Sequence, residues 1–552
     1  MGPTDDQSTK LKKTVKDLLG ELPLTAEVYW LLRNPGKPLT KKFSLHAMKP
    51  ALPEWRVQVE ASPLYASGTA RRGLLKKGPA KPKKKILLFG MLRYWIEHVT
   101  LLGFALEGLG YDVSVLYLPY GIWFQPTSRF DLRRQNLYAR SILSKAAPTI
   151  RIESLMDQKP YGQALPGGLQ QALRGLAFLD TQYTLQSEDV DMKSELYNLR
   201  LDRNMQAASW SYEWMNRERP DLVIVPNGTI LEFAAVYQVA RELEIPTITY
   251  EFGEQRGKIW LAQDAEVMRQ ETGSIWEARQ SQPLTEGQLE QIHHFYANRQ
   301  SAKIWSNLIY SLQGAESEGG ERVRKTLHLD QRPVALLATN VVGDSLTLSR
   351  QVFSASMSDW VVRTIRYFMP RTETQLVIRV HPGELLVSGP SVADYVKEAL
   401  RGEELPEHIH LVAADDRVNT YDIVEIADLG LVYTTTTGLE MAMSGLPVIP
   451  VGNTHYRGKG FTLDVETWQE YFELLDKVLI APGNYRPTKA QVDLAWNYAY
   501  RFFFEYAQPY PWHLATMWPD VKEWPLKRVL SDEGQEIFGK TFRYLAGEPI
   551  AW

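Results

Sequence analysis

Two regions of the chain alternate short apolar runs with longer segments in which apolar residues recur every three or four positions. Such runs are typical of strands buried in a parallel sheet, and the longer segments are typical of the helices that cover it. In the first region, strands are predicted at residues 85–90, 112–118, 221–228 and 246–251, and helices at 94–109 and 231–243. The pattern predicts an α/β domain over residues 85–263, in which the polar and aromatic stretch 127–216 is a helical insertion.

A second series of the same kind begins at residue 333 and predicts another doubly wound domain, over residues 330–487. Its predicted strands are 333–338, 408–413 and those that begin at 376, 429 and 446, and its predicted helices are 355–367, 392–400, 418–426, 439–443 and 465–480. Residues 264–329 are predicted to be a helical connection, and residues 488–552 a helical tail rich in Trp and Tyr. Residues 1–84 lack the pattern and are predicted to be an irregular extension, apart from a short amphipathic helix at 10–20.

Two strands of the second series end in polar residues that suit an anionic ligand. One of them runs into His381 and Pro382. The other runs into four threonines and a glycine before a helix: Thr434, Thr435, Thr436, Thr437 and Gly438. Ligands of open α/β sheets bind at the carboxyl ends of strands, and hydroxyl and backbone N–H groups at a helix start bind phosphate. The pattern therefore predicts a phosphate site centred on the last two threonines.

These phrases resemble the nucleotide-binding half of GT-B glycosyltransferases, and more narrowly the bacterial capsule polysaccharide biosynthesis family, which includes the Kdo transferases of capsule export systems. The matching residues are Arg379, His381 with Pro382, the threonine run with Gly438 and Glu440, and the stretch 454–462. The match covers residues 415–472 and, less closely, the region around His381. The resemblance implies two Rossmann-like domains facing a cleft, with the acceptor bound by the first and the nucleotide sugar by the second.

The resemblance also implies roles for three of these residues. In the family the His-Pro pair contacts the nucleotide, and a glutamate at the place of Glu440 holds the ribose hydroxyls. The helix dipole also favours a glutamate in a first turn, so a surface position is the alternative for Glu440. Arg379 precedes His381 by two residues on the same strand face, so it faces the site or pairs with a neighbouring acid.

A glycine-spaced basic loop follows the last strand of the second series and carries His455, Arg457 and Lys459. Its glycines allow the backbone to approach a ligand closely. We expect its cations to neutralise a phosphate or a carboxylated sugar. The alternative is a solvated loop, which would leave its two aromatic side chains exposed to water.

A catalytic base is predicted where the last strand of the first domain ends, because an acceptor hydroxyl needs a group that removes its proton. Capsule-type transferases often have two acids and a glycine at this point, followed by an arginine. Glu251, Gly253 and Arg256 fit that phrase, but Phe252 replaces the second acid. Glu251 is the preferred base and Glu254 the second choice, and a structural role is the alternative for either.

Composition excludes several other classes. A formal net charge of −3 over 552 residues gives no global field for nucleic acid. The absence of cysteine excludes disulfides and thiolate metal sites, and no Asp, Glu or His cluster has metal-ligand spacing, so no cofactor or metal is expected. No apolar run is long enough to span a bilayer, which predicts a cytoplasmic protein. Residues 71–85 are strongly basic and are interpreted as a solvated linker, the alternative being adhesion to the anionic inner face of the cell membrane.

These observations together predict a glycosyltransferase that is inverting and independent of metal. It would move a sugar from a nucleotide donor to a glycan or lipid-linked glycan acceptor of capsule or another surface polysaccharide. By resemblance, the donor could be a CMP-linked acidic sugar such as CMP-Kdo, and a UDP-hexose or another donor stays open. Two alternatives stay open: a nucleotide-sugar epimerase of the same fold, and a catalytically silent nucleotide-binding scaffold subunit, which the loss of the second acid at Phe252 favours.

Overall fold

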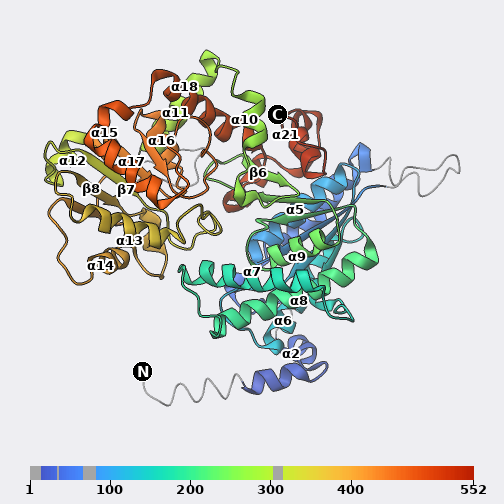
Figure 1. Ribbon diagram of the computed structural model, residues 1–552. Helices are drawn as coiled ribbons and strands as arrows, with labels where there is room; N and C mark the ends of the chain where they lie inside the picture. Colours follow the sequence, from blue (N-terminus) through green and yellow to red (C-terminus); the bar gives the residue numbers. More distant parts are fainter. Residues whose placement is uncertain (1–13, 34–35, 66–82, 302–314) are drawn as a thin grey trace.

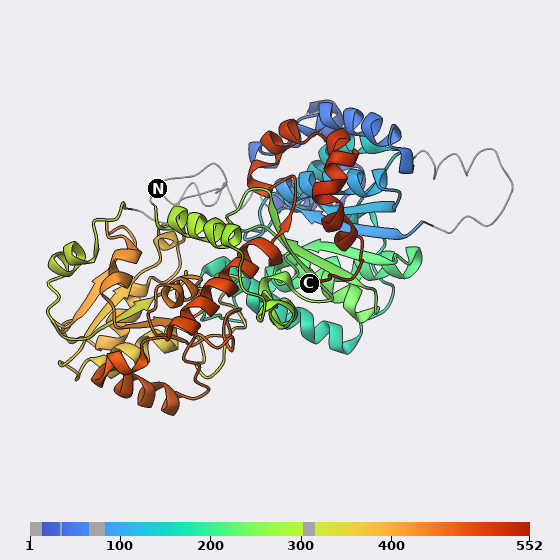
Figure 2. The same ribbon diagram turned by 90° about the horizontal axis from the view of Figure 1, so that it is seen from above.

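The computed structural model describes residues 14–33, 36–65, 83–301 and 315–552, which form two α/β domains, a connection and a C-terminal tail (Figure 1). One domain is built on a seven-stranded sheet and the other on a five-stranded sheet. Figure 2 shows the connection and the tail passing between the two domains. This is the predicted α/β class, with two Rossmann-like domains. None of the described helices combines the length and the apolar character needed to cross a membrane.

The first sheet has the strand order β12-β6-β5-β4-β1-β2-β3. The five strands from β5 to β3 are parallel, whereas β6 is antiparallel to β5 and β12 is antiparallel to β6. Every residue of β4 is buried, which explains its unbroken apolar sequence. The strands are β1 (Lys85–Met91), β2 (Asp112–Leu118), β3 (Arg151–Ser154), β4 (Leu222–Pro226), β5 (Thr247–Glu251), β6 (Lys258–Gln263) and β12 (Gln508–Pro509).

The second sheet has the order β11-β10-β7-β8-β9, and all its strands are parallel. Their carboxyl ends therefore meet at one edge, where the sequence predicts the ligand. The strands are β7 (Val334–Ala338), β8 (Gln375–Arg379), β9 (Ile409–Val412), β10 (Leu429–Val432) and β11 (Val448–Pro450).

Helices cover both sheets, and their apolar faces form the two cores. Gly90 allows one close contact of this kind, because a Cβ there would lie 2.7 Å from Val99 of α5. The helices before β7 are α2 (Thr25–Arg33), α3 (Met48–Glu60), α5 (Arg93–Gly108), α6 (Arg129–Leu143), α7 (Gly167–Leu185), α8 (Glu195–Glu218), α9 (Leu231–Glu242), α10 (Gly273–Arg279), α11 (Glu286–Gln300) and α12 (Gly320–Thr326). Those after it are α13 (Met357–Phe368), α14 (Val392–Leu400), α15 (Thr420–Ile426), α16 (Thr437–Met443), α17 (Trp468–Ile480), α18 (Lys489–Tyr500), α19 (Met517–Glu523), α20 (Leu526–Val529) and α21 (Asp532–Leu545).

The described part of the N-terminal extension is helical, which corrects the prediction of an irregular segment. Prolines at 50 and 53 argued against a helix, yet α3 forms and buries Met48, Leu52, Trp55 and Val59. The spacing of these four residues is that of a helix face, and it is the signal that the prolines obscured. Residues 14–21 are also helical, where the sequence predicts a helix at 10–20. Most of the basic stretch 71–85 lies outside the described residues, which resume at residue 83.

Two further strands, β3 and β6, are absent from the sequence prediction. The first, β3, is short and mostly polar because it lies at the edge of the sheet, whereas β6 is apolar in its middle and polar at its two ends, and only Ile259 and Leu261 of it are buried. The predicted helical stretch 127–216 therefore also contains one strand.

The C-terminal tail lies against the first domain and adds β12 to its sheet. Trp518 of α19 stacks on Trp55 of α3, with ring centroids 6.0 Å apart, and its Nε1 donates to Glu97 Oε2 over 3.2 Å. Arg256, which follows β5, forms an ion pair with Asp520 of the tail at 2.7 Å. Tyr510, Trp512 and Phe542 contribute to the core of the first domain, which explains the high aromatic content of the tail.

Candidate active site

A cavity of about 310 Å³ lies between the two domains, at the lower end of the usual size range for small-molecule sites. The carboxyl ends of β5, β7, β8 and β10 all open into it. Four segments carry most of its lining: 251–254, 338–346, 379–382 and 434–437. Arg299, Tyr421, Glu440, Phe502 and Phe503 complete the wall together with smaller contributions from the connection. The structure therefore brings the strand ends of both domains to one place.

Arg379 is a buried cation that forms no direct ion pair among the described residues, although the Asp416 carboxylate is close enough to favour its charged form. Its side chain is 2% exposed, and its Nη1 donates to the carbonyl of Ala413 over 2.6 Å while Nε donates to Thr420 Oγ1 over 3.3 Å. The third nitrogen, Nη2, is buried without a hydrogen-bond partner. Burial lowers the pKa of this guanidinium from its usual value. Arg379 lines the cavity, and the Asp416 carboxylate interacts with it electrostatically, so both sequence interpretations of this residue stay predictions.

His381 presents a neutral imidazole at the same edge. Its Nδ1 accepts the backbone N–H of Gly383 over 2.9 Å, so in the neutral ring the proton resides on Nε2. Burial, with a further contribution from Arg379, lowers the pKa of His381 to about 4. At neutral pH the ring is therefore a hydrogen-bond donor through Nε2 and carries no charge. Pro382 follows it in the wall of the cavity.

The four threonines line the cavity, but they do so through their side chains. The backbone N–H groups of Gly438, Leu439 and Glu440 are bonded to the carbonyls of Thr435 and Thr436, in the first turn of α16. Thr434 Oγ1 is buried and has no hydrogen-bond partner, while Thr436 and Thr437 are half-buried. The N–H group of Thr437 donates to Thr435 Oγ1, so the N–H groups at the start of α16 are engaged, and the Thr434 hydroxyl is a buried donor that this segment leaves unpartnered.

Gly438 does not line the cavity and has a packing role. A Cβ at this position would lie 2.3 Å from the hydroxyl of Tyr456 and 2.8 Å from Val432. The same hydroxyl donates to the carbonyl of Thr435 over 2.7 Å. The glycine therefore allows Tyr456 to hold the threonine segment in place.

Glu440 is buried and both its carboxylate oxygens are occupied. Oε1 accepts from Arg299 Nε over 2.6 Å, and Oε2 accepts from the hydroxyl of Tyr421 over 2.7 Å. Arg299 also pairs with Glu254 at the end of the first domain. One guanidinium therefore joins both domains at the cavity wall, and the ribose-binding role of Glu440 stays a prediction.

Glu251 lies at the cavity wall without a cation beside it. Asn227 Nδ2 donates to its Oε2 over 3.0 Å, and the backbone N–H of Phe252 donates to its Oε1 over 3.0 Å. Burial, with a smaller contribution from Asp344, raises the pKa of Glu251 to about 7. A carboxyl group of this pKa exchanges protons readily at neutral pH, as general acid–base chemistry requires. Glu254 contrasts with it, because Arg299 engages its carboxylate.

The basic loop does not reach the cavity. His455 stacks on Phe502 at 3.9 Å and is bonded through Nδ1 to the hydroxyl of Tyr498, and burial lowers its pKa to about 3. Arg457 donates to the carbonyls of Pro450 and Val465 and pairs with Glu466. Lys459 is half-buried beside acids of the connection. The aromatic residues of the loop, at 456 and 461, are buried, so the loop is a packing element against the tail.

Three residues of the site are not part of the sequence prediction. Asn340 accepts from the backbone N–H of Thr434 over 3.1 Å, and Asp344 lies in the same segment after β7, where burial raises its pKa. These residues follow the carboxyl end of a predicted strand, which is the signal that could have identified them. Arg299 lies in the connection, on helix α11, and no local pattern marks it.

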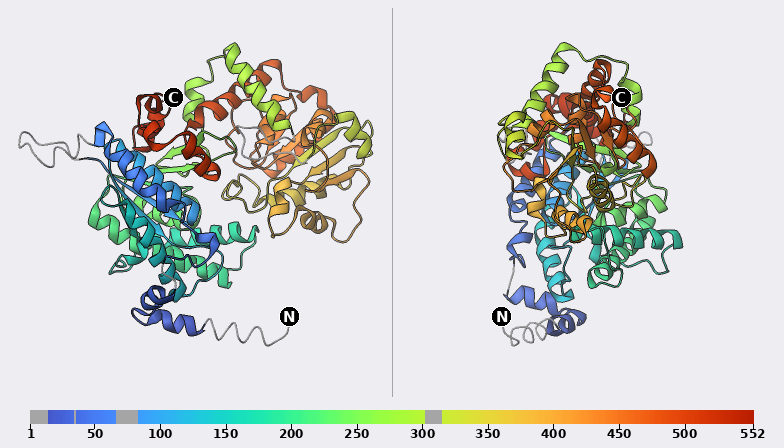
Figure 3. Two further views of the ribbon diagram at one scale, coloured as in Figure 1. Left: turned by 180° about the vertical axis from the view of Figure 1, so that it is seen from behind. Right: turned by 60° about the vertical axis from the view of Figure 1, so that its left-hand side comes forward.

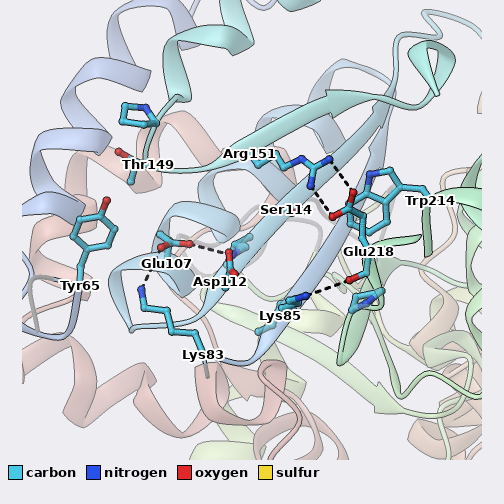
Figure 4. A pocket seen from close by; sticks show the side chains of 14 residues that line it. Tyr65, Lys83, Lys85, Glu107, Asp112, Ser114, Thr149, Arg151, Trp214 and Glu218 are labelled. Atoms are coloured by element: carbon cyan, nitrogen blue, oxygen red, sulfur yellow. Dashed lines mark hydrogen bonds and ion pairs between the residues drawn. The ribbon is translucent and has the colours of Figure 1, made fainter. Parts of the chain in front are cut away.

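A second cavity, of about 200 Å³, opens at the amino ends of β1 and β2 (Figure 4). Its cations have partners: Lys83 lies 3.5 Å from Glu107, and Arg151 lies 2.9 Å from Glu218. The third cation, Lys85, donates to the backbone carbonyl of Glu218 over 3.4 Å, so two of the three cations of this cavity are paired with carboxylates. Neither cavity contains a metal site, since no group of His, Asp and Glu among the described residues is placed to hold an ion.

No family model matches the chain, and no curated protein matches it. Similar solved structures include KpsC of Thermosulfurimonas dismutans, a β-Kdo 2,4-transferase, with 14% identity over 50% of this chain and 79% of that one and a TM-score of 0.30. They also include UDP-GlcNAc 2-epimerase of Neisseria meningitidis bound to UDP-GlcNAc, with 13% identity, 76% and 99% coverage and a TM-score of 0.25. A third is CalG4, the calicheamicin glycosyltransferase, with 11% identity, 80% and 98% coverage and a TM-score of 0.27. The structural neighbours thus include capsule Kdo transferases, other glycosyltransferases and epimerases of the same fold.

Proposed function

We propose that the chain is a glycosyltransferase that moves a sugar from a nucleotide donor to a glycan acceptor of a surface polysaccharide. The observation that carries the proposal is Arg379, a buried guanidinium at the cavity wall with one unbonded nitrogen and no direct ion pair among the described residues, where the Asp416 carboxylate acts only from a distance. Burial of a charge costs free energy unless the charge is paired, so an anionic ligand would stabilise this arginine. Thr434 Oγ1 and His381 Nε2 add neutral donors beside it. A phosphate group fits this set, since it accepts hydrogen bonds and supplies the negative charge.

In the proposed reaction, the acceptor hydroxyl attacks the anomeric carbon of the donor while the bond from that carbon to the phosphate oxygen breaks. Glu251 takes the proton of the hydroxyl, because it has no cationic partner and has a pKa of about 7. Arg379 and His381 stabilise the charge that develops on the departing phosphate. Inversion, a CMP-linked acidic sugar as the donor, and independence from metal are parts of the same proposal. The donor class rests on the sequence resemblance.

The first experiment measures nucleotide binding by calorimetry, with CMP, UDP, GDP and dTDP. We expect one of them to bind the wild-type chain, and Arg379→Met to weaken that binding by about tenfold to a hundredfold, as loss of a charged hydrogen bond does. Arg366→Met is the matched control, because Arg366 also donates to backbone carbonyls, of Glu398 and Ala399, but lies outside the cavity. Equal affinity in wild type and Arg379→Met would refute the placement of the phosphate.

A second experiment separates the three functional alternatives. The matching nucleotide sugar is incubated with the chain, with and without an acceptor glycan. A transferase forms a new glycosidic bond only with the acceptor, whereas an epimerase converts or releases the sugar without it. A silent scaffold subunit binds the nucleotide and changes neither substrate, an outcome that would contradict the role given to Glu251.

A further inference from the structure

The N-terminal hairpin, residues 14–33, has its polar side toward the protein and its apolar side toward water. It consists of helical residues 14–21 and helix α2. Eight of the twenty large apolar side chains that are most exposed in the described chain lie in it: Val15, Leu18, Leu22, Leu24, Val28, Tyr29, Leu31 and Leu32. Leu18 is 67% exposed, Leu31 65% and Leu32 77%. Soluble proteins rarely expose contiguous apolar patches of this kind unless the patch binds something.

Polar contacts attach the opposite side of the hairpin to α6. Lys16 pairs with Asp131 at 2.7 Å, Glu21 with Arg129 at 2.7 Å, and Glu27 with Arg133. Arg133 also donates to the carbonyls of Gly20 and Leu22, over 3.0 and 2.8 Å. The hairpin is therefore held by ion pairs and backbone bonds, together with the burial of Ala26 and the packing of Tyr29 on Phe130, whose ring centroids lie 5.5 Å apart. The most exposed leucines, at 18, 31 and 32, project into water on the other side. Figures 1 and 3 show α2 at the outer end of the first domain, beyond α6.

The charges that are left without partners around the hairpin are almost all positive. In the described part of residues 14–49, five exposed cations have no ion pair: Arg33, Lys37, Lys41, Lys42 and Lys49. Asp17 is the one exposed acid of that stretch that is not paired. The chain after the hairpin runs along α6, since the backbone N–H of Leu45 donates to Tyr138 Oη over 3.0 Å. The unpaired cations therefore lie at the end of the hairpin and in the segment that directly follows it along the chain.

We propose that the N-terminal hairpin docks on the surface of an anionic lipid bilayer. Leucine side chains on one face of two short helices enter the interface between headgroups and acyl chains, and neighbouring Lys and Arg side chains attract anionic headgroups. A second copy of this chain fits the surface less well, because the same five cations would meet across the two-fold interface. This surface differs from the basic stretch 71–85, and the proposal does not depend on the nature of the donor site.

Flotation of the purified full chain with vesicles tests the proposal. We expect binding to vesicles of phosphatidylcholine with phosphatidylglycerol, and at least tenfold weaker binding to phosphatidylcholine alone. Leu31→Ser with Leu32→Ser should reduce binding to the anionic vesicles by at least tenfold, and Lys41→Glu with Lys42→Glu should do the same. The matched controls are Leu385→Ser with Leu386→Ser, an adjacent exposed pair in the second domain, and Lys522→Glu with Lys527→Glu in the tail. Both controls should bind like wild type.

Two outcomes would overturn the proposal. Undiminished flotation of the leucine variant would assign membrane binding to another segment, such as 71–85, which the variant leaves intact. The second outcome is that the wild-type chain binds no vesicles and sediments as a dimer, while the leucine variant sediments as a monomer. This result would identify the partner of the hairpin as a second copy of the chain. Because the substituted side chains project into water, we expect the variants to keep the melting temperature and the nucleotide affinity of the wild-type chain. Failure of the membrane proposal can therefore be distinguished from failure of the proposed donor site.

Discussion

The Nε atom of Arg299 donates to Oε1 of Glu440 over 2.6 Å. The same guanidinium pairs with Glu254 at the end of the first domain and lies over the ring of Phe503, 5.2 Å from its centroid. Arg299 itself belongs to the connection and is buried. One cation therefore joins the first domain, the connection, the second domain and the tail at the wall of the interdomain cavity. This contact is one of those that link the two domains.

Removal of that cation should destabilise the whole chain. Arg299→Met leaves two buried carboxylates without compensation, for which a loss of about 3–5 kcal/mol in the free energy of unfolding is expected. Arg299→Lys should lose less, because it keeps the charge. Denaturant titration measures both, and Arg299→Met with Glu254→Gln provides the double variant. If the double variant loses as much as the sum of the single losses, the ion pair makes no contribution.

Substitution of Glu251, at the end of β5, should lower the transfer rate, whereas substitution of Glu254 should lower stability. Glu251→Gln keeps the size of the side chain but cannot accept a proton, so transfer should fall by about a hundredfold or more while nucleotide affinity stays at the wild-type value. Glu254→Gln should lower stability and leave the transfer rate within about a few fold, because its carboxylate is engaged by Arg299. Steady-state rates and calorimetry on both variants check this. Loss of transfer in Glu254→Gln alone would reassign the base.

The pH dependence of the rate should report the pKa of Glu251. Burial raises this pKa to about 7, so the carboxyl group is protonated, and inactive as a base, in acid. We expect kcat/KM to rise with pH and to level off above about 7. Because Asp344 adds to the shift, Asp344→Asn should move this rise to lower pH. A profile that is flat from pH 5 to pH 8 would contradict the role of Glu251.

The same shift has a consequence for stability. The folded pKa lies above the ordinary value of 4.5, so the folded state binds more protons than the unfolded state between these two values. Stability contributed by this group is therefore lost as the pH rises through about 7. Glu251→Gln, which stays neutral, should raise the melting temperature at pH 8 more than at pH 5. An equal change at both pH values would show that the carboxyl group is not perturbed.

The sequence predicts most strands and helices of both domains because the buried strands are continuous apolar runs. It misses β3, which is short and polar at the edge of the sheet, and β6, whose apolar run is only four residues long. It also misses α3, whose prolines outweigh the spacing of Met48, Leu52 and Trp55. These are positions where tertiary packing overrides a local preference.

For the site, local sequence identifies residues at strand ends but does not tell which loops reach the cavity. His381 and the threonines line it, whereas His455, Arg457 and Lys459 pack against the tail or close their own loop. A basic glycine-rich loop has the same composition in both situations. Arg299 illustrates the opposite case, since it becomes a cavity residue only through the docking of α11 between distant segments.

A second contact between the domains suggests a last prediction. Glu188, in the loop between α7 and α8, accepts the backbone N–H groups of Met357 and Ser358, each over 2.8 Å, at the start of α13. The first domain thus caps a helix of the second, and a carboxylate at such a position contributes about 0.3–2 kcal/mol. Glu188→Ala should therefore accelerate hydrogen exchange at these two amides.

The same variant should raise the KM for the donor by up to about tenfold, because a free energy of this size would otherwise favour the closed arrangement of the domains. Its kcat should stay near the wild-type value, since Glu188 is not part of the cavity wall. Glu195→Ala, an exposed acid in the first turn of α8, is the control and should change neither quantity. A fall in kcat at constant KM would place Glu188 in the chemistry instead of in domain closure.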